Sequence, residues 1–176
     1  LVDNFSTRTS ELTNEAYYIV LNAGTLTANA DVSTNYFRTS TSTSQRNINM
    51  GPGIWEVWGG GDVWNNSTSN NTTINGSNAT LKIKRPTGGN KSLYLFNGTY
   101  KKIVLGGTSG LGGGWYLYGG ATIDELISEK KASFSLVLDT TNPLTVNKFS
   151  FSGYYDNESW QTHLVNDIDN NQTTGI

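Results

Sequence analysis

Apolar and polar residues alternate along most of the chain with a period of two, which is the period of a β-strand. The clearest example is 79–85, where Leu81 and Ile83 share one face and two lysines the other. Other runs are continuously apolar, and the AYYIVLN run at 16–22 predicts a central buried strand. The predicted strands are residues 16–22, 54–58, 79–85, 92–96, 100–105, 115–118, 132–139 and 145–152.

Glycine- and asparagine-rich segments separate these runs and predict tight turns. The pair Asn97-Gly98 lies between the predicted strands 92–96 and 100–105, and this pair is typical of a two-residue β-hairpin. Short strands at this spacing, joined by such turns, are typical of two packed antiparallel sheets. The pattern therefore predicts an antiparallel β-sandwich.

Two segments depart from the period of two and predict helices. Thr122 and Glu125 have the spacing of a capping box, which predicts a short internal helix over 122–131. Apolar residues recur every fourth position in 157–170, which predicts a C-terminal helix that closes the sandwich.

Composition limits the size of the protein and the chemistry available to it. The 176 residues and 19.2 kDa are typical of one domain, residues 1–176, and the start at Leu1 suggests a fragment of a longer chain. Charged residues make up only 15% and the net charge is −2, which argues against nucleic-acid binding. No apolar run reaches 18 residues, so direct membrane insertion is not expected. Without cysteine and with one histidine, disulfides, metal sites and cofactors are not expected.

Aromatic residues interleaved with glycine and small amides point to carbohydrate. Trp58 and Trp64 flank a glycine run, and glycines bracket Trp115, Tyr116 and Tyr118. A sugar needs an exposed ring together with neutral amides and hydroxyls, and 81 of the 176 residues are Asn, Ser, Thr or Gly. The alternative is that these rings fill the core of a β-sandwich, and for 115–118 the two interpretations stay open.

Enzymatic interpretations find little support. Glycoside hydrolysis requires two carboxylates, and the nearest candidates are Glu56 and Asp62, beside a predicted hairpin. His163 lies in the predicted C-terminal helix, and the chain has no Gly-x-Ser-x-Gly motif to supply a nucleophile. The glycine-rich segment 106–114 lacks the third glycine of a dinucleotide fingerprint. We therefore expect a protein that is not an enzyme.

Several segments are similar to the head of the rotavirus outer-capsid spike protein. They are EAYYIVLNAGTLTANADVSTNYF at 15–37, LKIKRPTGGNKSLYLFNG at 81–98, GGWYLYGG at 113–120, ASFSLVLD at 132–139 and ESWQTHLVNDIDNNQTTGI at 158–176. The likeness as a whole spans about two-thirds of the chain. The resemblance implies a galectin-like sandwich of a divergent group, which binds host cell-surface glycans for attachment and has no enzymatic activity.

The resemblance also implies a site, partners and a location. GGWYLYGG falls on the family's glycan-contacting stretch, but the basic residue that precedes it there is absent, which favours a neutral oligosaccharide over sialic acid. The implied partners are a host glycan and other chains of the parent spike, and the implied location is the virion surface after synthesis in the host cytoplasm. The expected carbohydrate-binding residues are Arg46, Trp58, Trp64, Trp115, Tyr116 and Tyr118.

A second interpretation assigns the same carbohydrate binding to a different kind of protein. A lectin or carbohydrate-binding module of a bacterial adhesin or a secreted glycosidase needs the same exposed rings and small polar side chains. Composition does not separate the two.

Overall fold

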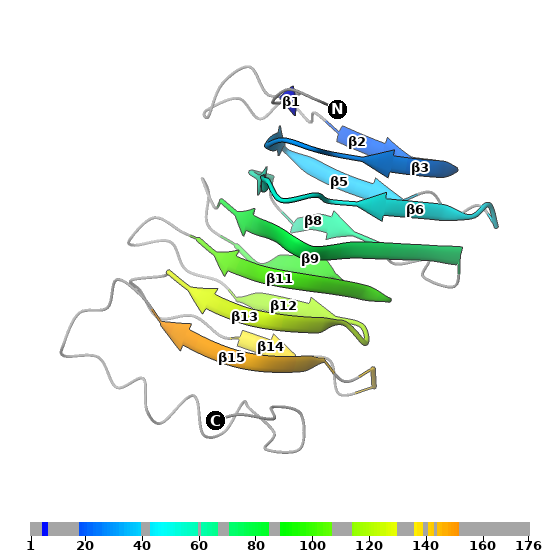
Figure 1. Ribbon diagram of the computed structural model, residues 1–176. Helices are drawn as coiled ribbons and strands as arrows, with labels where there is room; N and C mark the ends of the chain where they lie inside the picture. The colour runs from blue at the N-terminus through cyan, green and yellow to red at the C-terminus, as the bar shows by residue number, and fades with distance from the viewer. Residues whose placement is uncertain are drawn as a thin grey trace, which may run out of the picture.

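The chain folds as a parallel β-solenoid, whose coils stack on one another in chain order (Figure 1). The computed structural model describes residues 5–6, 18–39, 43–59, 61–66, 71–84, 89–106, 114–129, 136–138, 141–142 and 144–151. Every strand pair in these ranges is parallel. The chain therefore returns to the same sheet in the same direction after each coil.

Two sheets form opposite walls of the solenoid. In the described residues, the six-stranded sheet consists of β2 (Tyr18–Leu21), β5 (Tyr36–Thr39), β8 (Gly61–Asn65), β10 (Lys91–Tyr94), β12 (Trp115–Tyr118) and β14 (Leu136–Leu138).

The second wall changes along the solenoid. Its described strands number nine: β1 (Phe5–Ser6), β3 (Gly24–Thr27), β4 (Val32–Thr34), β6 (Arg46–Asn49), β7 (Ile54–Val57), β9 (Thr72–Ile83), β11 (Gly98–Leu105), β13 (Thr122–Ser128) and β15 (Thr145–Phe151). Early coils supply two short strands, and later coils supply one long strand. The long strand β9 joins the early coils to the later ones, because its first half pairs with β6 and its second half with β7.

Residues with positive φ turn the chain from the six-stranded to the nine-stranded sheet. Gly24, Asn97 and Gly119 follow β2, β10 and β12, with φ of 84°, 53° and 95°. Glycine and asparagine tolerate this left-handed region better than other residues. Next to Asn97, the Gly98 amide donates to the Leu95 carbonyl over 3.1 Å, which closes a tight turn.

The inward faces of both sheets form one apolar core with an aromatic cluster at its centre. Phe37 stacks on Trp64 with ring centroids 4.4 Å apart, and Trp55 meets both rings edge to face. Two of the buried indole N–H groups have an acceptor in this cluster: Trp64 Nε1 donates to the Tyr100 hydroxyl over 3.1 Å, and Trp55 Nε1 to the Met50 carbonyl over 3.0 Å. The tryptophans therefore stabilise the solenoid interior.

The predicted antiparallel, galectin-like β-sandwich is wrong, because both sheets are parallel. The alternation of apolar and polar positions reports only that one face of a strand is buried. It has the same period in a parallel solenoid, where both walls have a solvent face. The predicted hairpin at Asn97-Gly98 is wrong for the same reason, since β10 and β11 lie in different sheets.

The predicted helix over 122–131 is also wrong, because Thr122–Ser128 is strand β13. Ile123 and Leu126 are both buried, although they are three residues apart. Asp124 and Glu125 both face outward between them, so an irregular strand reproduces the spacing of a helix. The other predicted strands overlap observed ones, whereas the predicted helix at 157–170 lies outside the described residues. No helix in the described ranges has the length and apolar character needed to span a bilayer.

Candidate functional site

Aromatic side chains gather on the outer face of the six-stranded sheet. We call this surface the tyrosine face; its members are Tyr18, Tyr36, Arg38, Tyr94, Tyr116 and Tyr118, together with Asp62, Asn65 and Ser92 between them. On β5, β10 and β12 the members alternate with buried residues, and on β2 Tyr18 alternates with the half-buried Ile19. On β8 two consecutive buried residues separate Asp62 from Asn65. The parallel register therefore places residues from five coils on one surface.

Three tyrosines form a cluster on β10 and β12. Tyr94 is directly opposite Tyr118 in register, and their rings stack with centroids 4.9 Å apart and planes 18° from parallel. Tyr116 lies 6.5 Å from Tyr118 at an angle of 14°. Asn90 Nδ2 donates to the Tyr116 hydroxyl over 3.4 Å. Because Tyr118 covers one side of Tyr94, the other side of that ring is turned toward β8.

A second cluster lies on β2 and β5. The rings of Tyr18 and Tyr36 stack with centroids 4.8 Å apart. The Arg38 guanidinium carbon lies 4.7 Å from the centre of Tyr18 and 5.6 Å from that of Tyr36. These are cation–π distances, so the arginine is held against the rings.

Shorter polar side chains on β8 lie between the two clusters. Asn65 is in register with Arg38 on one side and with Tyr94 on the other. Asp62 is in register with Ser92. The face thus has an amide, a carboxylate and a hydroxyl in its middle, with tyrosines on both sides.

The protonation of Tyr94 reflects this environment. Burial raises the pKa of its hydroxyl, and the negative charge of Asp62 raises it further. The hydroxyl therefore keeps its proton at neutral pH and is available as a hydrogen-bond donor beside the carboxylate.

Only two of the six sequence-predicted site residues lie on this face, Tyr116 and Tyr118. Arg46, Trp64 and Trp115 are completely buried, and Arg46 Nε donates to the Thr72 hydroxyl over 2.8 Å inside the solenoid. A ligand at the surface does not reach them, so we do not retain them in the site.

Trp58 lies elsewhere, after β7 in the nine-stranded sheet, where Lys84 Nζ is 5.2 Å from its ring centre. Glu56 and Asp62, the carboxylates considered for glycoside hydrolysis, face outward from opposite sheets. Glu56 is instead paired with Lys84 at 3.4 Å. Two carboxylates on opposite walls do not flank one glycosidic bond.

The sequence reasoning missed Tyr18, Tyr36, Arg38 and Tyr94. The run at 16–22 predicted a fully buried strand, yet Tyr18 is 41% and Val20 51% exposed. The strand does alternate between exposed and core-facing residues. Tyr18 and Val20 are exposed, whereas Ile19 and Leu21 pack against the core.

No group of three or more metal-ligating side chains occurs among the residues the structure describes. Comparison of the chain with protein-family models, curated proteins and solved structures found no match. The function is therefore argued from the geometry of the tyrosine face.

Proposed function

We propose that the tyrosine face is a non-catalytic carbohydrate-binding site. The observation that carries the proposal is the arrangement on β8, where Asn65 lies in register between Arg38 and Tyr94 of the neighbouring coils and Asp62 lies beside Ser92. A sugar ring over β8 would meet with its C–H groups the side of Tyr94 that is turned away from Tyr118. Its hydroxyls would meet the Asn65 amide, the Asp62 carboxylate and the Ser92 hydroxyl.

The charges on the face favour a neutral sugar. Arg38 would attract a carboxylated sugar such as sialic acid, whereas Asp62 would repel it, and burying either charge against a neutral ligand requires a hydrogen bond. Sugar hydroxyls both donate and accept, so one neutral ligand satisfies both groups.

The binding is expected to be weak at a single site. Aromatic contacts of this kind contribute about 0.5–1.5 kcal/mol beyond their buried area, and hydrogen bonds in half-exposed positions about 0.5–1.5 kcal/mol each. A Kd near millimolar follows for one chain, and useful attachment then requires many copies on one particle or surface.

The same chemistry fits both sources considered from the sequence. Attachment to host glycans from a virion-surface spike, with other spike chains as partners, remains a proposal. So does a module of a bacterial adhesin or glycosidase. The parallel β-solenoid is not the galectin-like fold that the resemblance implied, so the fold does not support the first source. The proposal therefore rests on the tyrosine face and not on the resemblance.

Glycan-array binding of a fluorescently labelled, multivalent form of the chain tests the proposal. We expect Tyr94→Ala and Asp62→Ala each to reduce binding of a neutral glycan by about two- to twelvefold, as the loss of 0.5–1.5 kcal/mol predicts. Ile54→Ala is the control, because Ile54 is exposed on the opposite sheet. Absence of binding to every neutral glycan, or equal binding by the folded Tyr94→Ala variant, would refute the proposal.

A further inference from the structure

Threonine and asparagine form straight rows on the outer face of the nine-stranded sheet. The first row crosses six neighbouring strands in register and consists of Thr27, Asn49, Asn75, Thr99, Thr122 and Thr145. The second row lies two residues earlier and consists of Thr25, Asn47 and Thr73. We call both rows together the threonine–asparagine face. All of its members are exposed except the half-exposed Asn47 and Asn49.

The backbone fixes the spacing of this face in two directions. Neighbouring strands lie about 4.7–4.9 Å apart, and residues two positions apart on one strand are separated by about 6.6 Å. Threonine is restricted to few rotamers, and Asn49 Nδ2 donates to the Thr27 hydroxyl over 3.3 Å across the first row. The strands that carry the rows lie nearly parallel to one another (Figure 1). The result is a regular, preordered lattice of hydroxyls and amides.

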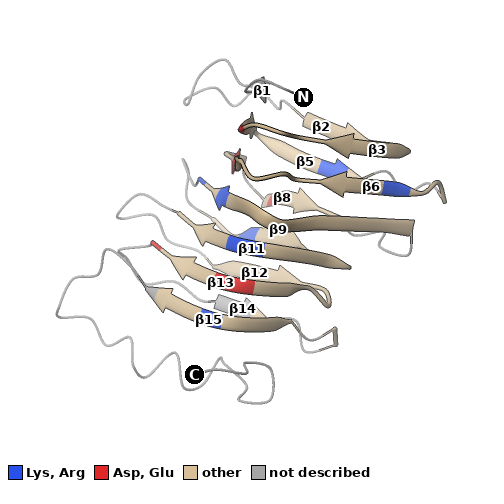
Figure 2. Ribbon diagram, in the orientation of Figure 1, with Lys and Arg blue, Asp and Glu red and all other residues tan. Residues whose placement is uncertain are grey.

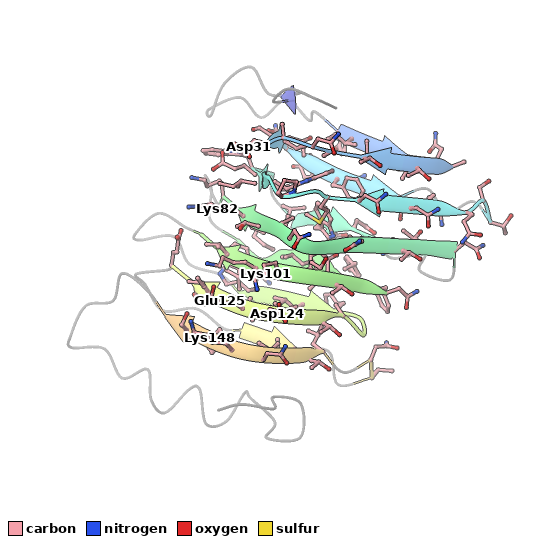
Figure 3. All side chains as sticks on the ribbon, in the orientation of Figure 1. Asp31, Lys82, Lys101, Asp124, Glu125 and Lys148 are labelled. Carbon is pink, nitrogen blue, oxygen red and sulfur yellow. The ribbon has the colours of Figure 1, made fainter. Side chains whose placement is uncertain are left out.

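The rows themselves carry no charged side chain. In the described part of this sheet, outward-facing charged residues lie further along the strands, the nearest being Lys101 and Asp124, two positions beyond Thr99 and Thr122 (Figure 2). They pair with one another: Lys101 with Asp124 at 3.5 Å, and Glu125 with Lys102 at 2.7 Å and Lys148 at 2.8 Å (Figure 3). Arg46 begins β6 but is completely buried. The rows themselves are neutral.

The occupant of this face must be neutral and periodic. A nucleic acid requires a basic surface, and a protein partner requires a central aromatic or apolar anchor, which the rows do not offer. Ice is a neutral lattice in which every water molecule both donates and accepts hydrogen bonds, with repeats close to those of the rows. Hydroxyls and amides at fixed spacing can replace water molecules in such a lattice, while the threonine methyls exclude disordered water.

We propose that the threonine–asparagine face binds ice. The proposal is independent of the carbohydrate site, because the two faces lie on opposite walls of the solenoid. An adsorbed solenoid would hold six strands of one row against the crystal at once, so many weak contacts add up.

The test grows a single ice crystal in a solution of the full 176-residue chain and measures the gap between its melting and freezing temperatures. We expect a gap for the wild-type chain and about a tenfold smaller one for Thr99→Tyr, because a bulky ring in the middle of the first row breaks the multivalent contact. Thr122→Val keeps the shape of the side chain and removes its hydroxyl, and should reduce the gap without affecting the fold. Ile54→Tyr on the same sheet and Tyr94→Ala on the other sheet should leave it unchanged.

Three results would overturn the proposal. The first is no gap for the folded wild-type chain, and the second is an undiminished gap for both folded Thr99→Tyr and folded Thr122→Val. The third is a wild-type dimer in sedimentation that Thr99→Tyr dissociates, since a second copy would then cover the face.

Discussion

Aromatic side chains at alternating positions of a strand have opposite roles in this protein. Trp115 and Tyr116 are neighbours on β12, but Trp115 is completely buried and Tyr116 is half-exposed on the tyrosine face. Glycines around both residues suggested open rings, but they do not determine which ring points outward. Direction of the side chain decides whether it serves stability or binding.

This difference gives a prediction for the two neighbours. Trp115→Ala should destabilise the protein by about 3–5 kcal/mol, because it leaves a large cavity in the core. Tyr116→Ala should cost less than about 1 kcal/mol, because its ring is on the surface. Urea unfolding followed by circular dichroism measures both, and equal losses for the two variants would contradict the assignment.

Glu125 gives a prediction about pH. Its carboxylate accepts hydrogen bonds from Lys102 and Lys148, which lower its pKa from 4.5 to about 2. Because the pKa is lower in the folded chain, the resulting stabilisation is present above about pH 4.5 and is lost as the pH falls toward 2.

Glu125→Gln should therefore be less stable than the wild type at pH 7, and the difference should shrink between pH 4.5 and pH 2. Thermal unfolding at a series of pH values follows this difference. A difference that stays constant down to pH 2 would show that the two lysines do not act on this carboxylate.

At the scale of elements, the turns do as much as the strands to set the fold. Gly51 has a φ of 68°, and a Cβ there would collide with the Ala28 carbonyl oxygen of the preceding coil. Gly24 has a φ of 84° but open space around it. Substitutions at these two positions therefore distinguish the free-energy cost of backbone strain from the cost of steric contact between coils.

Gly24→Ala should cost about 1–2 kcal/mol, the penalty of a left-handed conformation for a residue with a Cβ. Gly51→Ala should cost clearly more, because the backbone of the neighbouring coil must also move. Urea midpoints compare them directly. Equal costs would mean that the coils are not packed as closely as the structure shows.

The elements also show where sequence reasoning succeeds and fails. Strands such as 79–85 and 115–118 were predictable because burial on one face leaves its period in the sequence. The direction of the strands was not predictable, since it depends on whether a turn such as Asn97-Gly98 reverses the chain within a sheet or carries it to another.

The informative pattern was a repeat that begins with the polar–apolar–polar triplet Thr25–Thr27. A threonine or asparagine in register with Thr27 occurs in each of the next coils, 22 to 26 residues after the one before it. This spacing is an internal repeat, the signature of a solenoid. The candidate site was only partly predictable, because Tyr116 and Tyr118 lie two positions apart in the sequence, whereas Tyr94 and Asp62 join them only through the register.

For the whole molecule, each coil contacts mainly the coils before and after it, which predicts a gradient of local stability. β9 is paired on both sides, with β6 and β7 on one and β11 on the other, whereas β3 at one end of the sheet pairs with β6 alone among the described strands. Amide hydrogen exchange should therefore be slowest in β9 and β11 and faster in β3. Uniform exchange across these strands would indicate a single cooperative unit.

The repeat of 22 to 26 residues also shapes how such a molecule can change over time. An in-frame duplication of one of the later coils adds a strand to each wall without disturbing the register of its neighbours, since each coil pairs mainly with the coils before and after it. Both outward faces would lengthen together by one rung. Duplication of a gene segment can thus change the length of both outward faces in steps of one coil.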